Sequence, residues 1–346
     1  MQEILLHARR VILGASSVLV AATLPAQAQA PMSYLQTAGP AADPVTHLNW
    51  GLLAISLAVV VIICILVLWA TFHRRPPAQQ RLDGRTALEI ARDGMPWITI
   101  GVGISTAVLL GAAAWTMITL SAVAAPSANE ALHINVIAHQ WWWEVSYPGK
   151  QQSELTIVAN EIHIPVGQPV LLRLESDDVI HSFWIPKLAG KTDMIPGQTN
   201  RAWLQANQAG DYRGQCGEYC GAQHAQMVMH VIAEPPDAFA AWLRRQRQPS
   251  TTPTDAQALH GQQIFLARCS MCHTVNGSDA GGRAGPDLTH LMGRHTIAAG
   301  VLPNTVEELT RWVAHPQDVK PGVRMPVIEL NQDDLHALVT YLETLK

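Results

Sequence analysis

Three apolar runs dominate the hydrophobic pattern of the first third of the chain. The first, residues 11–24, follows two arginines and is shorter than the roughly 20 apolar residues that a membrane-spanning helix needs. Behind it, small residues alternate around Ala28 in the pattern of secretory cleavage sites. Residues 1–30 are therefore predicted to be a signal peptide, with a retained membrane anchor as the alternative.

Two further apolar runs carry no charged residue and are long enough to cross a bilayer. They predict transmembrane helices at about residues 50–70 and 97–123, within a hairpin that spans residues 31–128. The loop between them is rich in arginine, whereas lysine and arginine are scarce on the other side of both runs. Because positively charged loops stay in the cytoplasm, everything after residue 128 is expected on the periplasmic or outer side of a bacterial inner membrane.

The pattern changes after the second run. Residues 129–236 contain short β-branched or apolar runs separated by glycine and proline, which is typical of an all-β sandwich or barrel. Residues 237–256 are predicted to be a linker, because the second half of that segment is polar and contains two prolines. Residues 257–346 hold three stretches with helical spacing of apolar positions, which predicts a small all-α domain. The expected fold class is a membrane-anchored multidomain protein.

Composition narrows the possible functions. Charged residues make up 14% of the 346 residues and apolar ones 48%, which fits soluble domains attached to a few membrane spans. The net charge of −4 and the lack of a basic tract argue against nucleic-acid binding. Of the five cysteines, Cys64 lies alone in an apolar run, where we interpret it as a small hydrophobic residue. The other four form two close pairs, which in an exported protein indicates either disulfides or ligands.

The first cysteine pair lies among soft metal ligands. Cys216, Cys220, His224 and Met227 fall within twelve residues, and His181 precedes them in the sequence. Thiolate, imidazole and thioether are ligands that copper prefers, whereas a structural zinc site has no need of methionine. A mononuclear blue-copper site uses one cysteine, so a second cysteine allows two thiolates to bridge two copper ions. A disulfide between the two cysteines is the alternative.

The pattern Cys-x-Glu-x-Cys-Gly-x-x-His-x-x-Met, preceded by His-Ser-Phe-Trp, resembles the copper A (CuA) domain of cytochrome c oxidase subunit II. The resemblance covers residues 40–235 and implies a cupredoxin β-barrel with a dinuclear copper site. The implied copper ligands are His181, Cys216, the backbone carbonyl of Glu218, Cys220, His224 and Met227. By the same resemblance the cysteines bridge both ions, and the Glu218 side chain helps to hold a magnesium ion shared with subunit I. Trp141, in a run of three tryptophans, matches the position through which electrons enter, and simple burial is the alternative.

The second cysteine pair forms a c-type haem attachment motif. Cys269 and Cys272 are expected to bond the haem vinyl groups, and His273 to ligate the iron. A thioredoxin-like site is the alternative for the cysteine spacing alone. Pro286 follows at the distance seen in small class I cytochromes c, where its carbonyl accepts a hydrogen bond from the ligating histidine. Met325 is the expected sixth ligand, because Met/His ligation raises the potential of an electron-transfer haem.

Four residues remain alternatives to Met325 as the sixth ligand. Met292 follows too closely after Pro286 and suits the core better. The three histidines are more typical of surface or capping positions. These alternatives are Met292, His290, His295 and His315.

The two motifs together resemble subunit II of caa-type haem–copper oxidases, which carry a fused cytochrome c domain. The resemblance implies that electrons pass from an external cytochrome c or cytochrome bc complex, through haem c and CuA, to a haem in subunit I. Oxygen would be reduced to water there, with proton pumping, and subunit III is a further expected partner. A nitric-oxide reductase partner remains the alternative. A quinol oxidase lacks the copper ligands, a nitrous-oxide reductase needs a large propeller domain, and a copper-delivery protein does not explain the haem motif.

Overall fold

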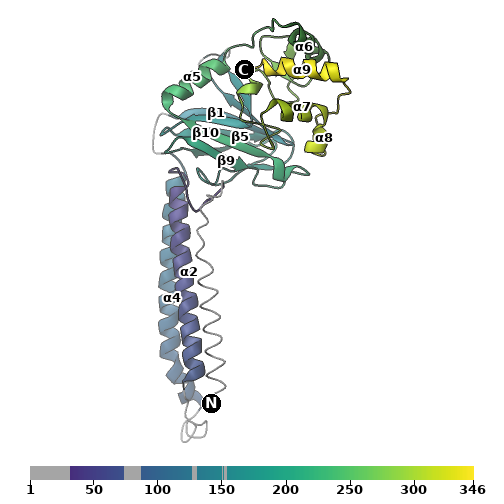
Figure 1. Cartoon of the computed structure of the whole chain (residues 1–346). Helices are drawn as coiled ribbons and strands as arrows, with labels where there is room; N and C mark the ends of the chain where they lie inside the picture. The colour runs from purple at the N-terminus through teal and green to yellow at the C-terminus, as the bar shows by residue number, and fades with distance from the viewer. Residues whose placement is uncertain (1–31, 74–86, 127–130, 150, 152–153) are drawn as a thin grey trace.

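The computed structural model describes residues 32–73, 87–126, 131–149, 151 and 154–346. The predicted signal peptide and most of the arginine-rich loop lie outside these residues. Two long helices form a stalk, and a β-rich domain and a small helical domain lie side by side at one end of it (Figure 1). The predicted fold class, a two-helix hairpin with an all-β cupredoxin-like domain and an all-α cytochrome c domain, is confirmed.

The stalk consists of helices α2 (Asp43–Phe72) and α4 (Ala87–Val123). Asp43–Phe72 and Met95–Val123 are long and apolar enough to cross a membrane. Helix α2 begins earlier than the apolar run because Asp43 and a proline in the first turn favour helix initiation there. Nearly all the large apolar side chains of both helices are exposed, so they need lipid or another subunit around them.

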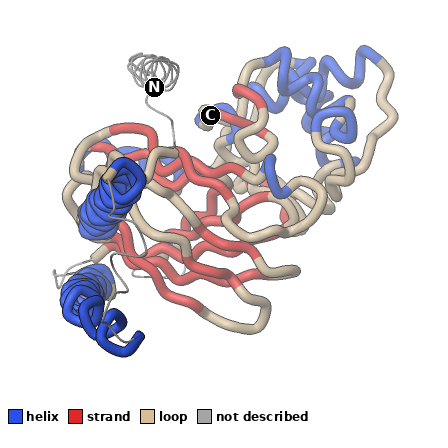
Figure 2. Tube along the Cα trace, turned by 90° about the horizontal axis from the view of Figure 1, so that it is seen from below, coloured by secondary structure: helices blue, strands red, loops and turns tan. Residues whose placement is uncertain are grey.

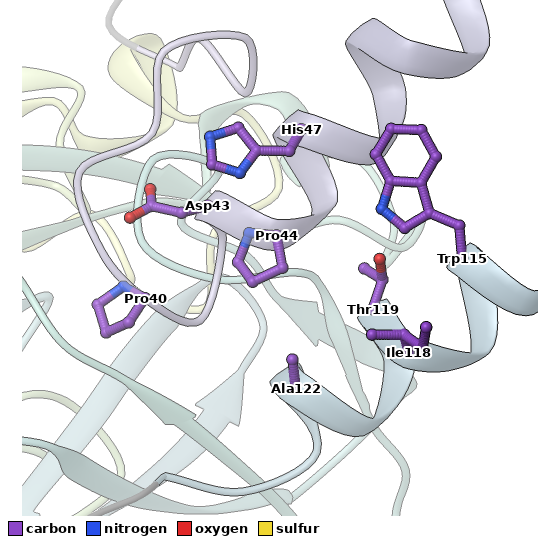
Figure 3. A pocket seen from close by; sticks show the side chains of 8 residues that line it. All are labelled: Pro40, Asp43, Pro44, His47, Trp115, Ile118, Thr119 and Ala122. Carbon is purple, nitrogen blue, oxygen red and sulfur yellow. The ribbon is translucent and has the colours of Figure 1, made fainter.

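The two helices pack closely at one end of the stalk. A Cβ atom on Gly51 would lie 2.2 Å from the ring of Trp115, so glycine permits this approach. Close to this contact, an open pocket of about 320 Å³ is lined by His47, Trp115 and Thr119 among others (Figure 3). Trp203 Nε1 donates a hydrogen bond of 2.7 Å to the carbonyl of Val123, which ties the end of α4 to the β domain.

The β domain is built from two sheets and a short hairpin, β6–β7. One sheet has the strand order β3-β2-β1-β5-β8 and the other the order β4-β10-β9. Strand β1 pairs in parallel with β5, and β10 with β4, so the chain crosses over between neighbouring strands. Figure 2 shows these strands in red, gathered into one body. The strands are β1 (Leu132–His139), β2 (Trp142–Tyr147), β3 (Thr156–Ala159), β4 (Glu161–Pro165), β5 (Val170–Ser176), β6 (His181–Phe183), β7 (Thr192–Met194), β8 (Asn200–Leu204), β9 (Gly210–Gln215) and β10 (Val228–Glu234).

Residues 237–246, which the sequence assigned to a linker, belong instead to helix α5 (Pro236–Gln246). Phe239 and Trp242 are buried in the core of the β domain, and the Trp242 ring stacks on His163 with ring centroids 4.0 Å apart. Prolines at its start and two arginines in its last turn favour the helix. The linker prediction rested on the polar, proline-containing second half of residues 237–256, whereas the first half forms this helix.

The C-terminal domain is built around the crossing of helices α6 (Ala256–Arg268) and α9 (Gln332–Glu343). A Cβ atom on Gly261 would lie 1.9 Å from the carbonyl oxygen of Ala337, so the helices meet where no side chain separates them. Helices α7 (Val306–Ala314) and α8 (Pro316–Val319), and the short pairs β11–β12 (Thr274–Val275, Ala280–Gly281) and β13–β14 (Thr296–Ile297, Leu302–Pro303), complete the domain. The side chains of Asp255, Thr305 and Asn331 cap α6, α7 and α9.

Candidate metal centres

The loop between β9 and β10 carries the first set of soft ligands. Its two ends are joined by a hydrogen bond of 3.0 Å from Cys216 N to the carbonyl of Met227. A second bond of 2.9 Å, from Gly217 N to the carbonyl of Ser182, fixes the loop against β6. Because β6 begins at His181, this bond brings the remote imidazole to the two cysteines.

The distances within this cluster suit a pair of soft metal ions. His181 Nδ1 lies 3.8 Å from Cys216 Sγ, and His224 Nδ1 lies 3.6 Å from Cys220 Sγ. Met227 Sδ lies 3.9 Å from Cys220 Sγ. Cys216 Sγ also contacts the carbonyl of the partly buried residue Glu218 at 3.1 Å. Thiol, imidazole Nδ1, thioether and carbonyl groups therefore converge on one point, and this donor set fits copper.

Both thiols are buried and free. Cys216 and Cys220 are each 3% exposed, and neither forms a disulfide. His181 is fully buried, and its ligand atom and those of the two cysteines all lie within 4.8 Å of one another. The hydrogen bond from Cys220 lowers the pKa of Cys216, and the same contact raises that of Cys220. Thiols bind metal ions as thiolates, so metal binding at this pair would release protons.

Asp178 orients the remote histidine. Its Oδ1 lies 2.9 Å from His181 Nε2, which leaves Nδ1 facing the cysteines. Burial opposes ionisation of Asp178, but hydrogen bonds from His181 and from the backbone amides of Gln140 and Val179 lower its pKa to about 2. Burial alone would lower the pKa of His181, whereas its bonds to Asp178 and Cys216 raise it. A carboxylate behind a ligating imidazole fixes the tautomer and orientation of the ring.

Replacing Asp178 with alanine is expected to weaken copper binding by about 10–100-fold, since His181 loses the group that orients it. A chelator-competition titration of the purified protein measures the change. Asp177→Ala is the matched control, because the Asp177 side chain is 68% exposed and contacts His139 rather than the cluster. Equal copper affinity in the two variants would remove this role of Asp178.

Trp141 contacts the backbone of the copper loop. Its Nε1 donates a hydrogen bond of 3.0 Å to the carbonyl of Cys220, and the side chain of Gln140 donates one of 2.8 Å to the same oxygen. Trp141 is 8% exposed. The ring of Trp141 therefore lies directly against the backbone of Cys220. It is also buried, which fits the alternative that Trp141 is simply a core residue.

The haem attachment motif lies at the end of α6. Cys269 is the C-cap residue of this helix, and Cys272 and His273 follow in the next turn. His273 Nδ1 lies 2.8 Å from the carbonyl of Pro286, the partner expected from the sequence. A Cβ atom on Gly285 would lie 2.7 Å from the His273 ring, so the chain passes close beside the imidazole. Burial lowers the pKa of His273 and favours the neutral ring that a metal requires.

Met325 lies in the partly buried loop after α8. Gln317 Nε2 donates hydrogen bonds of 2.9 Å to the carbonyls of Val323 and Met325, which fixes the backbone of the loop. Met292, one of the alternatives, packs against the core of the helical domain. Another alternative, His290, has both ring nitrogens within 3.0 Å of backbone carbonyl oxygens.

Sequence reasoning gave no role to Asp178, Lys320 or Arg324. The only sequence signal for Asp178 is its position three residues before His181. Lys320 and Arg324 lie in the same short segment as Met325, but most of their partners lie in the other soluble domain. No local pattern points to such partners.

Comparisons with known proteins identify both soluble domains. Residues 149–234 match the family described as "Cytochrome C oxidase subunit II, periplasmic domain", and residues 258–346 match the cytochrome c family. The chain is 33% identical over 296 residues to "Cytochrome c oxidase subunit 2" of Alkalihalophilus pseudofirmus, covering 84% of this chain and 83% of that one. It is 36% identical over 225 residues to the protein of the same name from Bacillus sp. (strain PS3), covering 62% of each.

A solved structure matches about a third of the chain. The periplasmic domain of subunit II of cytochrome oxidase of Bradyrhizobium japonicum is 29% identical and has a TM-score of 0.33, covering 35% of this chain and 96% of that one. The two matched families indicate copper and haem c as cofactors. The chain belongs to the cytochrome c oxidase subunit 2 family, carries a fused C-terminal cytochrome c domain, and is thereby a subunit of a haem–copper terminal oxidase.

Proposed function

We propose that this chain relays electrons from an external donor, through its haem c and a dinuclear copper centre, to a haem in subunit I of the oxidase. The donor is a cytochrome c or a cytochrome bc complex. Oxygen is reduced to water in subunit I with proton pumping, and subunit III completes the complex. One observation carries the proposal: two buried free thiols lie between two imidazole Nδ1 atoms in a chain that also holds a haem attachment motif.

In this proposal the copper loop supplies a nearly complete ligand set. Cys216 and Cys220 would hold both ions through their thiolates, and His181 and His224 would each present Nδ1 to one of them. Met227 and the carbonyl of Glu218 are weak ligands. A copper pair that shares one electron changes its geometry little on reduction. The protein supports this by burying the donors and by holding His181 against Asp178.

The haem domain holds its cofactor in the same manner. Cys269 and Cys272 would attach the haem covalently, and His273 and Met325 would hold its iron. The carbonyl of Pro286 accepts a hydrogen bond from His273 Nδ1, which leaves Nε2 to face the iron. Methionine as the second axial ligand supplies the raised potential that electron transfer requires.

A magnesium ion at Glu218 belongs to the same proposal. The Glu218 carboxylate is 45% exposed and lies 3.5 Å from Lys191 Nζ, so this chain contributes one carboxylate to such a site. Magnesium takes six oxygen ligands, so the others would come from water and from subunit I. The exposed stalk helices anchor the chain in a bacterial inner membrane, and both soluble domains then lie on the periplasmic side.

Replacing Trp141 with phenylalanine tests the path of the electron. The variant keeps an aromatic ring but loses the hydrogen bond to the Cys220 carbonyl. We expect oxygen uptake by the purified complex, driven by reduced cytochrome c, to fall about tenfold, as misplacement of reacting groups does. The copper EPR spectrum should not change.

Trp142→Phe is the matched control, because the Trp142 ring stacks on His139 rather than contacting the copper loop. Equal oxygen uptake by the two variants would exclude Trp141 as the residue through which electrons reach the copper.

A further inference from the structure

The β domain, which holds the copper ligands, and the C-terminal domain, which holds the haem motif, meet at a polar interface. The residues of this interface are not themselves among the predicted copper or haem ligands. Figure 1 shows the helical domain lying against the β domain. Glu161, which is 4% exposed, accepts hydrogen bonds from the backbone amides of His295 (2.7 Å) and Thr296 (3.1 Å). Val228 N donates a bond of 3.1 Å to the carbonyl of Ala299. Buried backbone groups of each domain thus find their partners in the other.

Lys320 bridges the two domains. It is 2% exposed, and its Nζ lies 3.0 Å from the carbonyl oxygen of Trp141 and 3.1 Å from those of Gln226 and Ala298. The first two carbonyls belong to the copper domain and the third to the haem domain. An ammonium group has three hydrogens to donate, so this set can satisfy all of them.

Burial of this side chain has an energetic cost. Burial lowers the pKa of Lys320 to about 8, because the charged ammonium has left water. Such a group is retained where its hydrogen bonds are complete, and its loss leaves buried carbonyls without a donor. Lysine at this position therefore favours one arrangement of the two domains over others.

The contacts of Lys320 lead directly to the copper ligands. Gln226 precedes Met227 in the chain, and Trp141 is bonded through Nε1 to the carbonyl of Cys220. A single residue therefore lies between Lys320 and each of two copper-loop ligands, Met227 and Cys220. Its own segment continues to Met325.

Arg324 makes a second bridge from the same segment. Its guanidinium lies 3.4 Å from Asp178, the carboxylate that orients His181, and 3.2 Å from the side-chain oxygen of Gln140. Arg324 immediately precedes Met325. A third contact, from Gln223 Nε2 to the carbonyl of Pro321 at 2.6 Å, fixes the start of the segment to the copper loop.

We propose that Lys320 and Arg324 are positioning residues that hold the Met325 segment of the haem domain against the copper loop, so that electrons pass from haem c to copper across this interface. The inference rests on the proposed function. The haem held by this chain would give up one electron, and the copper pair would accept it. No covalent bond forms or breaks, and no proton moves.

The linker alone does not explain such an arrangement. A tether raises the effective concentration of one domain near the other, but it does not select an orientation. The bonds of Lys320 and Arg324 tie the Met325 segment to particular groups of the copper domain, and they therefore select one orientation.

The test replaces Lys320 with methionine in the full chain, with haem attached and copper bound. We expect the intramolecular rate of copper reduction, after photoreduction of the haem, to fall about tenfold. Amide hydrogen exchange at His295 and Thr296 should accelerate about tenfold as the interface loosens. The haem absorption and copper EPR spectra should stay as in the wild type. Arg324→Met should shift both rates in the same direction, and its side chain is 64% exposed, so folding does not depend on it.

Arg283→Met is the matched control. Arg283 also reaches across the interface, to Glu144, but only at 3.8 Å and from outside the Met325 segment, so both rates should stay within about twofold of the wild type. Unchanged exchange in both the Lys320 and Arg324 variants would overturn the positioning role. Faster exchange with an unchanged electron-transfer rate would overturn the claim that electrons cross this interface. A wild-type chain without a dinuclear copper spectrum would instead contradict the proposed function.

Discussion

Replacing Cys220 with serine is expected to abolish the dinuclear copper centre. The wild-type chain, loaded with copper, should give a multiline EPR spectrum from one electron shared over two copper ions. A hydroxyl is a poor ligand for soft copper, and a single thiolate at Cys216 does not hold two ions at equal strength. The variant should therefore show the simple spectrum of a mononuclear copper, or bind none.

Another cysteine of the same chain, Cys64, provides a control for the Cys220→Ser substitution. Cys64 lies exposed on helix α2, far along the sequence from the copper loop, and Cys64→Ser should leave the multiline spectrum intact. A multiline spectrum that persists in Cys220→Ser would remove the thiolate bridge from the proposal. A wild-type Cys216–Cys220 disulfide, detected by mass spectrometry after thiol alkylation, would do the same.

Replacing Met325 with alanine has the second largest expected effect. Loss of a thioether ligand lowers the reduction potential of the haem, and we expect a fall on the order of 100 mV in a redox titration. The weak far-red absorption typical of methionine-ligated ferric haem should disappear. The backbone of the loop should keep its place, because Gln317 holds it through the carbonyls of Val323 and Met325.

Met292→Leu is the comparison that decides between the two methionines. Met292 packs against apolar side chains of the helical domain, so an apolar residue of similar volume should cost little and leave the potential unchanged. A fall in potential with Met292→Leu and none with Met325→Ala would reverse the assignment of the sixth ligand.

The sequence was most informative where the residues that bind a cofactor lie close together in the chain. Cys216, Cys220, His224 and Met227 stand within one loop, and Cys269 to His273 within one turn, so their residue types indicate a metal before any fold is known. The apolar runs of the stalk are equally local. The family and the fold class were predicted correctly from these patterns, while the individual ligand roles stay predictions.

Features that depend on neighbours distant in the sequence were not accessible in this way. Helix α5 was assigned to a linker because the prediction rested on the polar residues that follow it, whereas its two buried aromatic rings have partners in the β domain. The role of Lys320 was hidden for the same reason: Trp141, which it contacts, lies 179 residues away. Tertiary contacts of this kind follow from the fold and not from local periodicity.

Asp178 contacts groups that belong to both redox domains. One of its carboxylate oxygens bonds to His181, and the other lies 3.4 Å from Arg324 of the haem domain. Two binding events that share one group are thermodynamically linked, and such a linkage is reciprocal. Whatever factor domain docking adds to the copper affinity, copper binding must add to domain docking. Copper binding and docking of the haem domain would then change each other's equilibrium by the same factor through a single carboxylate.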